Sequence, residues 1–165
     1  MTFAPRTWVV GEVVTAALLN QEIRDQFNSM FAAWTTYTPT WTAATTNPVL
    51  NNGTINGRYM KIGRTTLVAF RLTMGSSTTY GSGAYSFGVP SAAASSSVDA
   101  IGGTRLTSGS TYIGQLFLGS GGSAFNATFP TAATPANASN MTATTPATLA
   151  SGDIMRGSIA YEAAA

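Results

Sequence analysis

The chain has no cysteine and no histidine among its 165 residues. Without cysteine, neither a disulfide nor a thiolate metal site contributes to the fold. Hydrolytic triads that depend on histidine or cysteine are excluded as well. We therefore expect no metal ion and no cofactor.

Charge is also scarce, because charged residues make up 8% of the chain against roughly 25% in an average soluble protein. The net charge is +2, and the basic residues form no cluster along the sequence, where they occupy Arg6, Arg24, Arg58, Lys61, Arg64, Arg71, Arg105 and Arg156. A nucleic-acid surface requires a basic cluster. We expect a neutral, hydroxyl-rich surface and no nucleic-acid partner.

Long apolar runs are missing too. No stretch reaches the roughly 18 apolar residues that a membrane-spanning helix requires. Residues 1–14 lack the basic region followed by an apolar core that marks a secretion signal. The sequence therefore predicts neither membrane insertion nor secretion by a signal of its own.

The size of 17.0 kDa fits one domain with a short appendage. Hydrophobic residues account for 44% of the chain, but much of this is alanine, which buries little area. We therefore expect an oligomer more than a self-sufficient monomer.

An N-terminal helix is predicted after an irregular arm over residues 1–11. Thr15 is a suitable N-cap, and Val14 and Leu19 are spaced as a hydrophobic staple. The helix is expected to run from Ala16 to about Ala33, so that residues 1–35 form an attachment and trimerisation stalk.

Apolar residues within this helix follow a heptad. Ile23, Phe27, Met30 and Trp34 are spaced four, three and four residues apart, as d and a positions are. A polar Asn at such a position fixes register. The predicted trimer seam consists of Leu19, Asn20, Ile23, Phe27, Met30 and Trp34. The alternative is that the stripe packs on its own β-domain.

Residues 36–165 are predicted to form an antiparallel β-sandwich of about eight strands, because β-branched and aromatic residues alternate with small polar ones between turn signals. Pro39 indicates a sheet edge, and Gly63-Arg64 indicates a hairpin. Alternation places one row of side chains in the core, namely Val68, Phe70, Leu72 and Met74. Residues 131–151 fit either a surface excursion or an irregular strand. The fold class is mainly β, preceded by one α-helix.

Two candidate sites remain. Asp99, Asp153 and Glu162 lie near predicted strand ends and offer the carboxylate pair of a glycosidase, although such residues more often cap turns. Tyr80 and Tyr85 flank Gly81 and Gly83 as candidate glycan contacts, since sugars stack on aromatic faces. The alternative is that Tyr85 belongs to the core and Tyr80 covers the loop. We expect no enzymatic activity.

Several motifs resemble the N-terminal segments and β-domains of actinobacteriophage tail and fibre proteins. The N-terminal ones are RTW at 6–8, GEVVTA at 11–16, LN at 19–20 and IRD at 23–25. The later ones are YTPTW at 37–41, GRY at 57–59, GSGAY at 81–85 and ASGD at 150–153, with a closing strand that ends in YE at 161–162. The resemblance covers most of the chain.

This resemblance implies a homotrimeric virion protein, assembled in the bacterial cytoplasm, with a jelly-roll head similar to those of the tumour-necrosis-factor family. The N-terminal segment would attach it to other tail or capsid proteins, through Phe3, Arg6, Trp8, Arg24 and Asp25. Arg24 and Asp25 are adjacent and so would point to different neighbours.

The expected function is a fibre or minor tail protein that displays its head for adhesion to the host surface. Long tail fibres extend well beyond 165 residues, so a capsid decoration or head-fibre protein without a ligand is the first alternative. A carbohydrate-binding module that recognises a host-cell glycan is the second.

Overall fold

The computed structural model describes residues 6–95, 98–130 and 137–164 of the chain. Phe3, one of the predicted attachment residues, lies outside the described residues, as do residues 131–136 of the stretch left open above.

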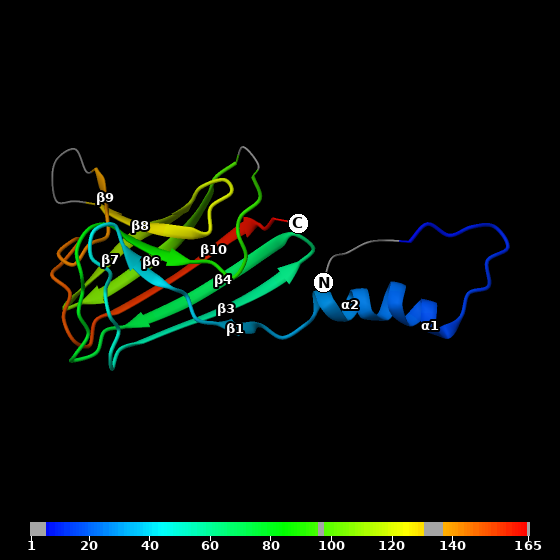
Figure 1. Ribbon diagram of the computed structural model, residues 1–165, viewed down its shortest axis with the longest axis horizontal. Helices are drawn as coiled ribbons and strands as arrows, with labels where there is room; N and C mark the ends of the chain where they lie inside the picture. The colour runs from blue at the N-terminus through cyan, green and yellow to red at the C-terminus, as the bar shows by residue number, and fades with distance from the viewer. Residues whose placement is uncertain (1–5, 96–97, 131–136, 165) are drawn as a thin grey trace.

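The N-terminal helix consists of α1 (Ala16–Leu19), one π-helical turn η1 (Asn20–Arg24) and α2 (Asp25–Met30). The Leu18 amide donates to Thr15 Oγ1 at 3.3 Å, which confirms the predicted cap. The helix ends before the expected Ala33, because the chain must turn after Phe31 to enter the first strand. It projects from the end of the sandwich at which the β3–β4 turn lies (Figure 1).

The remaining chain forms one antiparallel sheet. Its strands are β1 (Thr35–Tyr37), β2 (Trp41–Ala43), β3 (Thr54–Ile62), β4 (Thr65–Thr73), β5 (Tyr85–Gly88), β6 (Ala100–Ser108), β7 (Ser110–Leu118), β8 (Ala124–Pro130), β9 (Ala138–Asn140) and β10 (Ile154–Glu162). The strand order is β1-β3-β4-β10-β6-β7-β8-β5-β2, with β9 paired to β8.

The sheet curls until its two edges approach each other. β1 and β2 lie at opposite ends of the strand order, yet only residues 38–40 separate them. Such a connection spans at most about 14 Å, so the edges lie close together. Pro39 is buried in this crossing and has no N–H for the ladder, which confirms the sheet-edge prediction.

Aromatic rings fill the space between the two halves of the curled sheet. Phe70 of β4 lies 5.5 Å from Phe87 of β5 and 5.1 Å from Phe125 of β8, measured between ring centroids. The predicted core row is buried in full, as Val68, Phe70, Leu72 and Met74. The predicted fold class, an antiparallel β-sandwich preceded by a helix, is therefore confirmed.

The hairpin at Gly63 is also confirmed, since this residue has a φ of 60°. The described part of the 131–151 stretch combines both alternatives. It contains the short strand β9 and then an irregular segment that places Met141 and Leu149 in the core.

Candidate functional site: an apolar stripe and an arginine row

The helix carries an uncovered apolar stripe. Leu19, Ile23, Phe27 and Met30 are each between 42% and 57% exposed. In the single chain these four residues do not pack fully on the β-domain, contrary to the alternative, whereas Trp34 does lie against it. Contiguous exposed apolar residues on a soluble protein indicate an interaction surface.

The π turn modifies the predicted heptad. The Asp25 amide donates to the carbonyl of Asn20, five residues earlier, instead of to that of Gln21. A π turn takes up one additional residue, so the helix before it is rotated relative to Ile23, Phe27 and Met30. Asn20 is exposed.

Trp34 does not belong to the helix. It lies just before β1 and lines a shallow depression of about 280 Å³ together with Leu67, Ile101 and Ala160. These residues belong to the outer face of the sheet, which is the face directed away from the core. Trp34 thus links the helix to this face.

The outer face carries an apolar row across five neighbouring strands at the end nearest the helix. Met60 faces Leu67, Leu67 faces Ala160, and Ile101 faces Phe117 in the strand pairings. Ala160 and Ile101 line the same depression. Because Ile101 is 66% exposed, this row continues the uncovered apolar surface of the helix.

Farther from the helix, the outer face carries a row of arginines. Arg156 of β10 pairs directly with Arg71 of β4 on one side and with Arg105 of β6 on the other. All three side chains are exposed, and Arg105 Nη2 donates to Thr111 Oγ1 at 3.2 Å. Three of the eight basic residues, dispersed in the sequence, therefore gather here, which local sequence patterns do not reveal.

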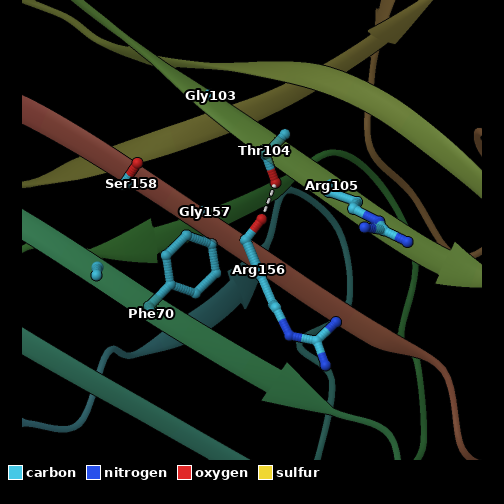
Figure 2. A pocket seen from close by; sticks show the side chains of 8 residues that line it. Phe70, Gly103, Thr104, Arg105, Arg156, Gly157 and Ser158 are labelled. Carbon is cyan, nitrogen blue, oxygen red and sulfur yellow. Dashed lines mark hydrogen bonds between the residues drawn. The ribbon is translucent and has the colours of Figure 1, made fainter.

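Small residues separate the apolar row from the arginine row. Ala69, Ser158 and Gly103 face one another on β4, β10 and β6. They line a shallow depression of about 540 Å³, which Arg105 and Arg156 also line. Figure 2 shows both arginines extending from adjacent strands beside Gly103 and Ser158. Thr104 Oγ1 donates to the Arg156 carbonyl at 2.9 Å and ties the two strands together.

The predicted attachment residues form two local ion pairs. Arg6 pairs with Glu12, and its guanidinium lies 5.3 Å from the centroid of the Trp8 ring. Arg24 and Asp25 pair with each other at 2.9 Å. The expectation that they point to different neighbours is wrong, because rotation about their side-chain bonds brings the two charged groups together.

Tyr80 and Tyr85 do not form a glycan platform. Tyr85 is fully buried, and its hydroxyl donates to the Tyr80 carbonyl at 2.6 Å. Burial, followed by the neighbouring Tyr80, raises the pKa of Tyr85 to about 12. Tyr80 is half-buried against the core. The alternative, in which Tyr85 is core and Tyr80 covers the loop, is correct.

The candidate glycosidase carboxylates each have another partner. Asp153 is buried and accepts from the Ala150 amide at 2.8 Å, Asp99 accepts from the Ser120 amide at 2.9 Å, and Glu162 pairs with Arg64 at 3.2 Å. Asp153 directly precedes β10 and Glu162 ends it, so the two residues lie roughly 30 Å apart at about 3.3 Å per residue. A glycosidase requires about 5 to 10 Å, so this pair does not meet the geometry.

Comparison with protein-family models, curated proteins and solved structures finds no match to this chain. Among the described residues, no group of three acidic, histidine or cysteine side chains is placed to hold a metal ion. No helix in that part of the chain is long and apolar enough to cross a membrane. The features of the described residues that bear on function are therefore the apolar stripe and the outer face.

Proposed function

We propose that this chain is a homotrimeric virion structural protein, a short phage fibre whose N-terminal stalk attaches it to the particle and whose β-sandwich head faces the host surface. The observation that carries the proposal is the apolar stripe. Leu19, Ile23, Phe27 and Met30 remain exposed on a helix that projects from the head. A chain that leaves such a stripe uncovered requires a partner for it.

A second copy of the chain is the simplest partner. Short isolated helices are marginal in water, so helices of this length gain stability by packing their stripes together. The apolar row extends that surface onto the head through Trp34, Leu67 and Ile101. Burying this surface is worth roughly 25 cal/mol per Å² of apolar area. The number three comes from the resemblance to trimeric phage fibres.

The residues around the stalk support attachment at its N-terminal end. Arg6 lies over the Trp8 ring, while Glu12 neutralises its charge. A cation over an aromatic face is a compact amphipathic contact. Trp8 is exposed there. In this proposal, the arm places Trp8 against a neighbouring virion protein.

Particles that lack the chain test this function and separate adhesion from decoration. If the chain is an adhesive fibre, such particles assemble but adsorb poorly to host cells, and supplying the full-length chain restores adsorption. Normal adsorption combined with easier breakage on heating would contradict adhesion and favour a decoration protein.

Particles assembled with Trp8→Ala, matched by Thr7→Ala on the same arm, test attachment. Only the Trp8 variant should be depleted from purified particles.

A further inference from the structure

The arginine row places like charges at facing positions across three strands. Arg71, Arg156 and Arg105 occupy facing positions on β4, β10 and β6. Facing like charges destabilise a sheet. Neighbouring strands lie about 4.8 Å apart, so the three residues span about 10 Å across the sheet. A bound anion would offset the repulsion between these arginines and so compensate for the lost stability.

The chain does not supply that anion from its own carboxylates. Glu12, Asp25 and Glu162 pair with Arg6, Arg24 and Arg64. Asp99 and Asp153 accept from backbone amides. These are five of the six acids in the sequence, and the sixth, Glu22, lies on the helix. Because five of the six acids are already engaged, a second copy is also poorly equipped to neutralise the row.

The surroundings of the row suit a sugar chain. Ala69, Ser158 and Gly103 form a furrow beside it, with a volume of about 540 Å³. Beyond the row, hydroxyl groups lie at Thr73 of β4, Thr107 of β6 and Thr111 of β7, with Ile154 of β10 between the first two. Hydroxyl side chains donate to and accept from sugar hydroxyls, while guanidinium groups bind carboxylates with two parallel hydrogen bonds.

We infer that the arginine row and its furrow bind a glycan that carries carboxylate groups. This inference rests on the proposed function for its biological role, because it names the ligand class for the head. A nucleic acid is less suited, since single-stranded binding relies on aromatic stacking platforms. The residues that face the ends of the row are Asn56 and Ile113, neither of which is aromatic.

Titration calorimetry of the full-length chain tests the inference with oligogalacturonate, a linear glycan with one carboxylate per sugar. We expect saturable binding at an ionic strength of about 0.15 M, where long-range attraction is largely screened, and no binding of the fully methyl-esterified form. Arg156→Gln should weaken binding about tenfold, because a hydrogen bond to a charged group is lost. Arg156→Lys should weaken it less, since it keeps the charge.

Two further variants distinguish a specific loss of binding at the site from a general effect of charge and from misfolding. Lys61→Gln removes one positive charge elsewhere and should change the affinity by less than about twofold. Gly103→Leu fills the furrow and should weaken binding while every arginine is kept. A Cβ at residue 103 would meet no atom within 4 Å, so this variant should fold normally. Circular dichroism of each variant checks that it has folded.

Three results would overturn the inference: no binding of oligogalacturonate, unchanged binding by Arg156→Gln, or equally tight binding of an oligothymidylate, which would indicate a nucleic-acid surface instead. Sedimentation of the same samples separates the two proposals. A trimer that does not bind contradicts the glycan site alone. A monomer that binds contradicts the trimeric fibre alone.

Discussion

The buried tyrosine hydroxyls of the head differ in their hydrogen bonds: those of Tyr85 and Tyr161 each have a partner, whereas that of Tyr37 has none among the described residues. Tyr85 Oη donates to the Tyr80 carbonyl at 2.6 Å. Tyr37 Oη is buried with no partner among the described residues, although its ring stacks edge-on against Tyr59 at 5.8 Å. Burial, and then Tyr161, raises the pKa of Tyr37 well above its usual value. The Tyr37 side chain therefore contributes through its ring and not through its hydroxyl.

Removal of each hydroxyl should have a different effect on stability. Tyr85→Phe should lower the free energy of unfolding by about 1 kcal/mol, because a satisfied hydrogen bond is lost. Tyr37→Phe should leave it unchanged or raise it, because a buried hydroxyl without a partner is removed. Urea unfolding at one fixed protein concentration measures both. A larger loss for Tyr37→Phe than for Tyr85→Phe would mean that the Tyr37 hydroxyl has a partner.

At the scale of single elements, the strands of the head could be predicted from the sequence and the arginine row could not. Alternation identifies the inward side chains of each strand, and it correctly places Val68, Phe70 and Leu72 in the core. The same alternation places Arg71 on the outer face. Alternation does not identify which strand lies next to β4 in the sheet. The pairing of β10 with both β4 and β6 joins segments that are far apart in the sequence.

The helix was predicted in part for a similar reason. The cap and the apolar spacing are local features of the sequence, and Thr15 forms the predicted cap. The π turn at Asn20–Arg24 and the end at Met30 depend on how the stalk joins β1, which local spacing does not record. Local spacing therefore places Trp34 in the seam of the helix, whereas it lies against the outer face of the sheet.

The arginine row also makes a prediction for the stability of β10. Arg156 faces an arginine on each side, and each facing pair costs roughly 0.2–1 kcal/mol. Because Arg156→Gln removes both facing pairs, it should raise the free energy of unfolding by about 0.4–2 kcal/mol, while Lys61→Gln should not. Thermal unfolding at low salt measures the difference, which should shrink as salt screens the charges. A destabilised Arg156→Gln would mean that the row is neutralised within the protein.

On the scale of the whole molecule, the stalk and the head present one continuous apolar surface. The curl of the sheet closes the core within the head, because residues 38–40 connect its two edges. The core therefore needs no partner. The helix stripe, Trp34 and the apolar row remain outside it. Association between copies would thus cover the stalk and the adjoining end of the outer face.

Because this surface is apolar, charges placed in the seam should dissociate the oligomer. Ile23→Asp together with Phe27→Asp would bury two carboxylates in an apolar contact, which costs several kcal/mol. Gln21→Asp together with Asn28→Asp adds the same charge to the same helix at exposed positions off the stripe. The first variant should dissociate and the second should not.

Sedimentation equilibrium of the full-length chain, run beside these two variants, tests the trimeric stalk most directly. We expect a mass near three times 17.0 kDa for the chain and for the off-stripe variant, and a monomer for Ile23→Asp/Phe27→Asp. A monomeric full-length chain, or a seam variant that stays trimeric, would contradict it.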